Sequence, residues 1–162
     1  MNQQSKPRWL TLAEEYIGTK EIPGNKHNQD IIDFWESARL TFKTDETPWC
    51  AGFVGAMLEE SGIRSTRSGM AKSYLKWGIK LEKPVLGCLV IFTRKGGGHV
   101  GFVQGTDKQG NLYVLGGNQS DSVCVKLFKK TNVVGYRWPE KEPLGNSLPV
   151  FDVATAFETK VV

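Results

Sequence analysis

Apolar residues in the first half of the chain recur at the spacing of amphipathic helices. Four segments carry this pattern and are predicted as helices: residues 9–17, 30–38, 49–58 and 70–77. Pro7 stands just before the first helix, where proline is tolerated, and Gly18 ends it. Turn-forming and polar residues fill 22–28 and 44–47 and separate the helices.

After Pro84 the pattern changes to short runs of β-branched and aromatic residues separated by turns. Five such runs are predicted as strands: residues 85–92, 99–104, 112–115, 123–128 and 133–138. Helices followed by a strand meander predict an α+β fold, with the helices packed on an antiparallel sheet of five or six strands. Residues 150–154 are either a late strand or an arm on a partner.

The composition fits one domain with one core. The chain has 162 residues, of which 40% are hydrophobic, and a formal net charge of +4. The basic residues are spread along the chain, so this charge suits an anionic polymer such as a cell wall or a nucleic acid without requiring one. The three cysteines lack the CxxC spacing of a zinc site and fit a reducing compartment of synthesis.

The sequence predicts neither a secretory signal nor a membrane span. Residues Met1 to Pro7 contain no apolar segment of the signal-peptide kind, and no apolar run approaches the ~20 residues that cross a bilayer. We therefore expect synthesis in the cytoplasm and no stable membrane insertion. A substrate outside the cytoplasm would require another component to deliver the protein.

Candidate chemistry is concentrated in two segments. Cys50 lies at the start of the most apolar predicted helix, where unpaired N–H groups and the helix dipole favour a thiolate and offer oxyanion donors. His99 opens a predicted strand directly behind three glycines, and it is one of only two histidines. A thiol needs a base, and imidazole is the usual one near neutral pH. Cys50 and His99 therefore predict acyl-transfer hydrolysis.

A third group should hold the imidazole tautomer from the neighbouring strand. Asn118 ends the strand that follows His99 and is predicted to accept a hydrogen bond from the ring. Gln119 and Asp121 should point to the opposite face, because side chains alternate along a strand. The alternative for Asn118 is a turn-forming role in the sequence Gly-Gly-Asn-Gln.

Each candidate has a purely structural alternative. Cys50 alone would be read as a packing residue, and only its position and the partner histidine favour catalysis. Cys88 and Cys124 lie within strand runs and are predicted to be buried small hydrophobic residues. His27 is expected to make local hydrogen bonds in a loop. Trp77 is more typical of a core or rim position than of a sugar platform.

Several segments together carry a resemblance to a known family. They are residues 7–10, 18–22, 45–54, 77–78, 84–87, 98–103, 115–119 and 135–139. In their order and spacing the chain resembles the NlpC/P60 and CHAP superfamily of papain-like cysteine peptidases and amidases, above all the small phage endolysins and bacterial wall hydrolases. The resemblance implies a papain-like catalytic domain over residues 1–139. It leaves a C-terminal tail, residues 140–162, without a predicted role.

The resemblance also implies a site and a function. Carried over by position, Cys50, His99 and Asn118 cleave an amide bond of peptidoglycan. The bond lies either within the stem peptide or between muramic acid and L-alanine, and the sequence does not distinguish the two. Phage lysis is the expected setting, with the protein acting as a monomer on the wall from the periplasmic side after delivery through a holin. Host range, and phage as against bacterial origin, are not indicated.

The chain departs from the family at two positions. Cys88 follows Gly87 where the family usually has Gly-Asp, and Gly116 stands where CHAP relatives often carry an acid, two residues before the asparagine. Both departures concern the third catalytic position, and neither touches the nucleophile or the base.

Two other functions fit the same residues: an antibacterial effector toxin with the same chemistry, and a non-catalytic wall-binding module. A nucleic-acid binder is disfavoured, because its aromatic candidates look like helix faces and not like a stacking platform. Those residues are Trp9, Trp35, Trp49 and Phe53.

Six further residues are predicted to bind substrate or support the site loops: Asp45, Glu46, Trp49, Trp77, Gly98 and Gln119. Asp45 and Glu46 lie in the segment before the nucleophile and would either order their loop through hydrogen bonds or bind Ca²⁺, as in some CHAP enzymes. Two adjacent acids supply fewer oxygens than calcium prefers, so hydrogen bonding is the favoured reading. No metal and no cofactor is expected.

Overall fold

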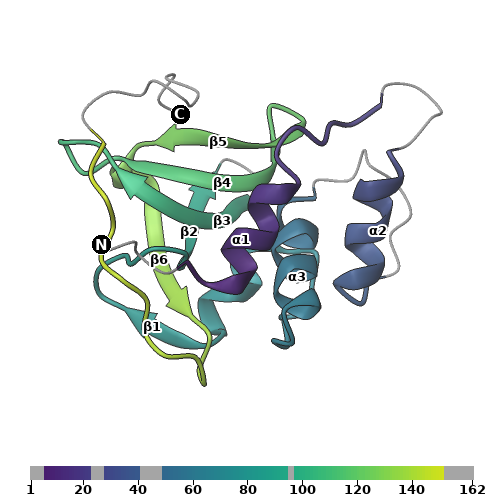
Figure 1. Ribbon diagram of the computed structural model, residues 1–162, viewed down its shortest axis with the longest axis horizontal. Coiled ribbons are helices and arrows are strands. Elements are labelled where there is room, and N and C mark those ends of the chain that lie inside the picture. The colour runs from purple at the N-terminus through teal and green to yellow at the C-terminus, as the bar shows by residue number, and fades with distance from the viewer. Residues whose placement is uncertain (1–5, 23–27, 41–48, 95–96, 152–162) are drawn as a thin grey trace.

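The computed structural model describes residues 6–22, 28–40, 49–94 and 97–151. Figure 1 shows its helices gathered on one side of a curved sheet. The helices are α1 (Arg8–Glu15), α2 (Gln29–Ser37) and α3 (Cys50–Glu60), with two 3₁₀ helices, η1 (Ala71–Lys76) and η2 (Lys130–Asn132). The four predicted helices are therefore confirmed, the last of them as the 3₁₀ helix η1.

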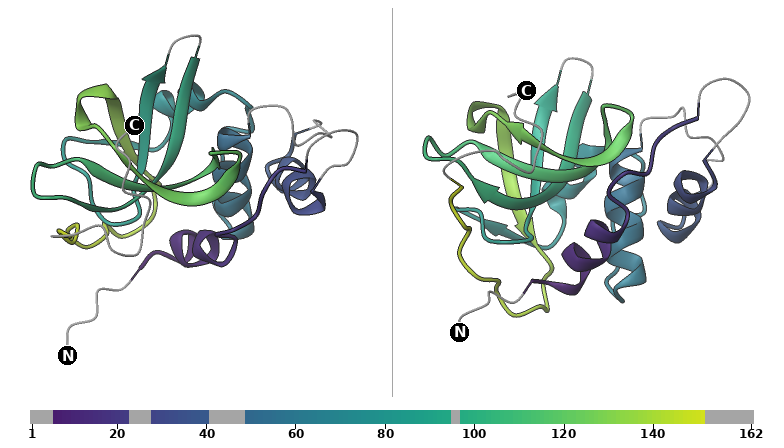
Figure 2. Two further views of the ribbon diagram at one scale, coloured as in Figure 1. Left: turned by 90° about the horizontal axis from the view of Figure 1, so that it is seen from above. Right: turned by 45° about the horizontal axis from the view of Figure 1, so that its top comes forward.

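Six strands form one antiparallel sheet in the order β1-β6-β2-β3-β4-β5. They are β1 (Ile79–Leu81), β2 (Leu89–Arg94), β3 (Gly97–Thr106), β4 (Leu112–Gln119), β5 (Ser122–Phe128) and β6 (Val133–Trp138). The predicted α+β fold with helices on an antiparallel sheet is confirmed. The two views of Figure 2 show α3 next to the sheet and α2 on the side of α3 that faces away from the sheet.

Two strand predictions need correction, and one strand was not predicted. The run 85–92 becomes a strand only at Leu89, because Gly87 has a φ of +84° and turns the chain before it. β4 continues through Gln119, where a turn was expected. β1 was missed, since three residues of which two are exposed leave no periodic signal.

Helix α3 forms the centre of the core. Every residue from Cys50 to Leu58 is buried, so this helix is apolar on all sides. It packs closely on α2, since a Cβ at Gly52 would lie 2.7 Å from the Trp35 ring. The aromatic residues predicted to be helix faces are confirmed as core residues, at most 1% exposed: Trp9, Trp35, Trp49 and Phe53.

The segment after Pro139 lies along the domain as far as it is described. Leu86 donates its N–H to the carbonyl of Asn146 at 2.9 Å, and Val150 forms a single parallel bridge with Thr106. The ring of Phe151 packs edge-on against Tyr113 with centroids 5.4 Å apart. At its start Glu142 pairs with Arg8 of α1 at 2.8 Å, and Figure 1 shows the later part of this yellow segment on the side of the sheet away from the helices. The proposed domain boundary at 139 stays a prediction, and residues 152–154 of the expected late strand lie outside the described residues.

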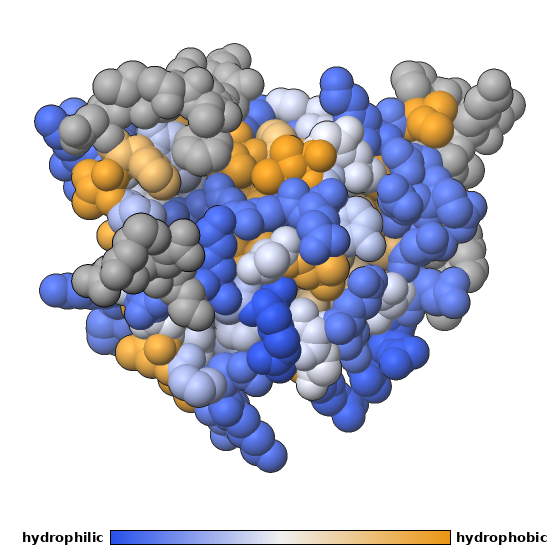
Figure 3. Space-filling view, in the orientation of Figure 1, coloured by the Kyte–Doolittle hydropathy of each residue, from blue (hydrophilic) through white to orange (hydrophobic). Residues whose placement is uncertain are grey.

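Within the described ranges, every helix is too short or too polar to cross a bilayer. Figure 3 shows one face that is largely hydrophilic, with separate hydrophobic patches. Among the exposed large apolar residues, Ile79 and Val134 lie in β1 and β6, and the others lie outside the helices and strands: Ile17, Ile22, Met70, Leu144 and Val150.

Candidate active site

Cys50 is the first residue of α3 and lies against strand β3. The pairing of β3 with β4 extends from Thr106 only as far as Phe102. Beyond that point the N–H of Val100 donates to the Cys50 thiol. The nucleophile candidate therefore sits where the β3–β4 ladder opens, beside the residue that follows His99. The N-terminus of α3 supplies further N–H groups at this place.

Burial decides the resting state of the thiol. It raises the pKa of Cys50, while the N–H of Val100 and the positive charge of Arg94 act in the opposite direction without cancelling the rise. A thiol with a raised pKa is protonated at neutral pH, so it requires a base before it can act as a nucleophile.

His99, the third residue of β3, is 1% exposed and stacks beside two aromatic rings. Its centroid lies 5.4 Å from that of Phe128 and 6.2 Å from that of Phe92, with interplanar angles of 20° and 25°. Burial lowers its pKa to about 4, and the charges of Arg94 and Lys126 act in the same direction. The imidazole is therefore neutral at neutral pH, the form that can accept a proton.

The hydrogen bonds of Gln119 fix the tautomer of His99. The Gln119 amide nitrogen donates to the carbonyls of Val114 (3.1 Å) and Cys124 (2.7 Å). Its Oε1 therefore faces His99 Nε2, at 2.9 Å, and can only accept. Nε2 must carry the proton, which leaves Nδ1 with the free lone pair of a base. Among the described residues, no hydrogen bond joins the Cys50 thiol to the His99 ring.

The prediction that Gln119 points away from His99 is wrong. Asn118 has a φ of +58°, and the β4–β5 pairing shifts its register between Gly116 and Gln119. Such a bulge interrupts the alternation of side chains along the strand. It turns Gln119 toward the ring and gives it the hydrogen bond that was expected of Asn118. Participation of Asn118 in catalysis stays a prediction.

The same geometry explains the missing acid at position 116. A Cβ at Gly116 would lie 2.5 Å from Gln119 Oε1 and 3.4 Å from His99 Nε2. The Gln119 amide thus occupies the space that a side chain at 116 would need. Relatives often carry an acid at position 116. In this chain the bulge brings Gln119 into that space instead.

Trp49 and Gly98 support the site through packing. Trp49 precedes Cys50 and is fully buried, and a Cβ at Gly117 would lie 2.7 Å from its ring. A Cβ at Gly98 would lie 3.0 Å from both Phe92 O and the Lys72 side chain, so only glycine fits comfortably there. Whether either residue contacts substrate stays a prediction.

Asp45 and Glu46 lie outside the described residues, as does His27. In the part of the chain that is described, no three His, Cys, Asp or Glu side chains gather as metal ligands would. The expectations of no metal and no cofactor, and the calcium alternative, therefore stay untested predictions.

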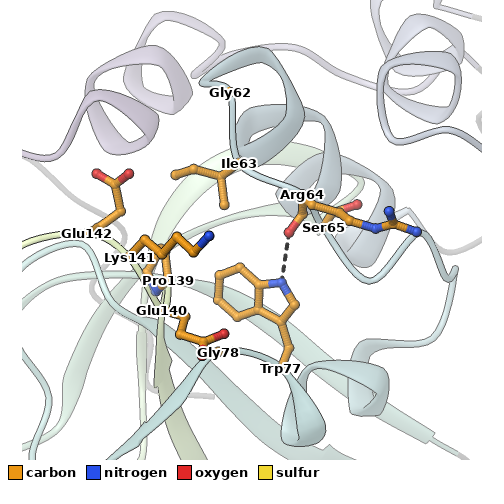
Figure 4. A pocket seen from close by; sticks show the side chains of 10 residues that line it. All are labelled: Gly62, Ile63, Arg64, Ser65, Trp77, Gly78, Pro139, Glu140, Lys141 and Glu142. Atoms are coloured by element: carbon orange, nitrogen blue, oxygen red, sulfur yellow. Dashed lines mark hydrogen bonds between the residues drawn. The ribbon is translucent and has the colours of Figure 1, made fainter.

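Trp77 does not join Cys50 and His99. It lines a cavity of about 700 Å³ near the C-terminal end of α3, and its indole N–H donates to Arg64 O at 2.9 Å (Figure 4). Helix α3 separates this cavity from Cys50 by ~16 Å, from the rise of 1.5 Å per residue. Trp77 is half-buried, as a rim residue would be.

The other two cysteines differ from one another. Cys88 is fully buried, as predicted. Cys124 is only partly buried, and its thiol donates to the Gln119 carbonyl at 3.3 Å. Cys124 therefore belongs to the surroundings of Gln119, a placement that its strand position did not indicate.

The α+β fold, with a cysteine at the start of a central helix and a histidine on an adjacent strand, is that of the papain-like class. A family model described as the CHAP domain matches residues 42–118 of the 162. The match confirms the predicted resemblance to the NlpC/P60–CHAP superfamily and indicates a peptidoglycan hydrolase or amidase. It ends one residue before Gln119. Comparisons with curated proteins and with solved structures gave no match.

Proposed function

We propose that this protein is an endolysin-type hydrolase that cleaves an amide bond of the cell-wall peptide, with Cys50 as nucleophile and His99 as base. The observation that carries the proposal is the hydrogen bond from His99 Nε2 to Gln119. It holds a neutral imidazole in the tautomer whose Nδ1 can accept a proton, one residue from the strand amide that contacts the Cys50 thiol. A merely structural histidine would not require this arrangement beside a helix-terminal cysteine.

The proposed reaction has two stages. His99 Nδ1 takes the thiol proton while the sulfur attacks the amide carbon, and N–H groups at the start of α3 stabilise the oxyanion. The imidazolium then gives its proton to the leaving amine, and the acyl group remains on Cys50 as a thioester. In the second stage His99 removes a proton from water, which attacks the thioester and releases a carboxylate and the free thiol.

We assign the orienting role to Gln119 in place of Asn118. The oxygen of a neutral amide can hold the ring by accepting a hydrogen bond from its N–H, but it does not take the proton itself. The two hydrogen bonds from the Gln119 nitrogen to backbone carbonyls hold that amide in one orientation. Phage lysis, action as a monomer and holin-dependent delivery to the wall remain part of the proposal, supported by the resemblance to small endolysins.

Digestion of purified cell walls tests the proposal. We expect mass spectrometry of the soluble fragments to show a new amine and a new carboxyl group at one amide position, which also identifies the cleaved bond. The Cys50→Ala protein should release none of these fragments. Equal release by Cys50→Ala would contradict the mechanism, and wall binding without new amine groups would favour the non-catalytic module. An effector toxin would give the same products but would be held in check by a dedicated immunity partner.

A further inference from the structure

Arg94 extends from the same sheet face as His99. In the β2–β3 pairing Phe92 lies opposite His99, and Arg94 follows Phe92 by two residues, so all three side chains share one face. The Arg94 guanidinium carbon lies 6.0 Å from the centroid of the Phe128 ring, which itself stacks on His99. The guanidinium therefore lies at the exposed border of the aromatic group that surrounds the catalytic ring.

Two lysines accompany Arg94. Lys126 lies two residues before Phe128 on β5 and therefore shares its face. Lys72, from η1, passes its alkyl chain over the glycine that precedes His99, with Cγ 3.0 Å and Cε 3.4 Å from the position of a Cβ at Gly98. Three cations from three elements thus surround the His99 end of the β2–β3 hairpin.

These cations have no carboxylate partner among the described residues. The ion pairs of that part of the chain use the carboxylates of Glu14, Glu59, Glu82 and Glu142, and none involves Arg94, Lys72 or Lys126. The positive charge of Arg94 nevertheless reaches both reacting groups, since it opposes the rise in the pKa of Cys50 and contributes to the lowered pKa of His99. An anionic group of the substrate would complete this arrangement.

We propose that Arg94, with Lys72 and Lys126 beside it, is a carboxylate-binding site that selects substrates with a free carboxylate next to the scissile amide. The inference rests on the proposed function, because stem peptides of peptidoglycan carry such carboxylates. Arginine suits the role, since its planar fork matches the two carboxylate oxygens. In some walls these carboxylates are converted to primary amides, which keep the shape but lose the charge.

The test compares two substrates that differ only in this group: soluble stem-peptide fragments with free carboxylates and the same fragments amidated. We expect wild-type kcat/KM to favour the acid form about tenfold, the size of one partly exposed charge-assisted hydrogen bond. In Arg94→Gln this ratio should fall to about one. Absolute rates with both substrates should also fall, because Arg94 favours the Cys50 thiolate, but this effect cancels in the ratio. Lys83→Gln, an exposed cation outside the site, should keep the wild-type ratio.

A wild-type ratio near one, or an unchanged ratio in Arg94→Gln, would overturn the inference. Equal losses on both substrates would assign Arg94 to the thiol alone. Calorimetric binding of the two fragments to Cys50→Ala separates this inference from the proposed function, because it requires no cleavage. Acid-selective binding that disappears in Cys50→Ala/Arg94→Gln would support the site even if the wild type cleaved neither fragment. Equal binding of both fragments would contradict it.

Discussion

The side chain of Gln119 fills the space that any side chain at Gly116 would need. A Cβ built at Gly116 would approach Gln119 Oε1 to 2.5 Å, although the two residues are separated by a bulge and lie three positions apart. The glycine and the glutamine are therefore a matched pair. Together they set the hydrogen bond that orients His99.

Removing the Gln119 amide should slow turnover without unfolding the protein. We expect Gln119→Ala to lower kcat about 100-fold, because His99 loses the acceptor that fixes its tautomer. The matched variant is Asn118→Gly, which removes the other amide while suiting the φ of +58° at that position. It should stay within a few fold of wild type. Wild-type kcat in Gln119→Ala together with a crippled Asn118→Gly would restore the original assignment to Asn118.

A methyl group at position 116 should have a similar effect from the opposite side. Gly116→Ala would push the Gln119 amide away from His99, so activity should fall at least tenfold, with a loss of unfolding free energy of about 1–3 kcal/mol from overpacking. Gly97→Ala is the control, since a Cβ there has no neighbour within 4 Å. Urea unfolding and wall-digestion rates provide both measurements. Full activity of Gly116→Ala would show that the His99–Gln119 contact is dispensable.

The buried imidazole should make stability depend on pH. The pKa of His99 is about 4 in the folded protein and 6.5 as a free side chain, so the unfolded state binds a proton first as the pH falls. The free energy of unfolding should therefore decrease as the pH falls from about 6.5 to about 4. Above about pH 6.5 the protonation of His99 should not change it. Between about pH 7.5 and about pH 4.5 the wild type should lose about 2–3 kcal/mol more than His99→Gln. Equal losses in urea titrations of the two proteins would place the ring in a polar environment.

The sequence predicted what depends on local pattern. Helical spacing located α3 and placed Cys50 at its start, and the change of period after Pro84 indicated the antiparallel sheet. The aromatic and charged surroundings of His99 could not be predicted, because they depend on the register of three strands. Phe92 lies opposite His99 through one pairing, and Phe128 reaches the ring from β5.

The third site residue was missed for a similar reason. Strict alternation along β4 predicts that Asn118 faces His99 and that Gln119 faces away. The left-handed backbone of Asn118 and the register shift beside it turn Gln119 toward the ring instead. The sequence did hold one signal, the glycine at 116 where relatives often have an acid. A missing side chain next to a catalytic histidine implies that another group occupies its space.

The most direct test of the account is the initial rate of amine release from purified peptidoglycan by three proteins. Wild type and Cys88→Ala, which alters a buried cysteine outside the site, should release amine at comparable rates. Cys50→Ala should be slower by about 10⁴-fold or more, because no other group can form the thioester. Amine release by Cys50→Ala at the wild-type rate would contradict the assignment of Cys50 as the nucleophile and, with it, the proposed function.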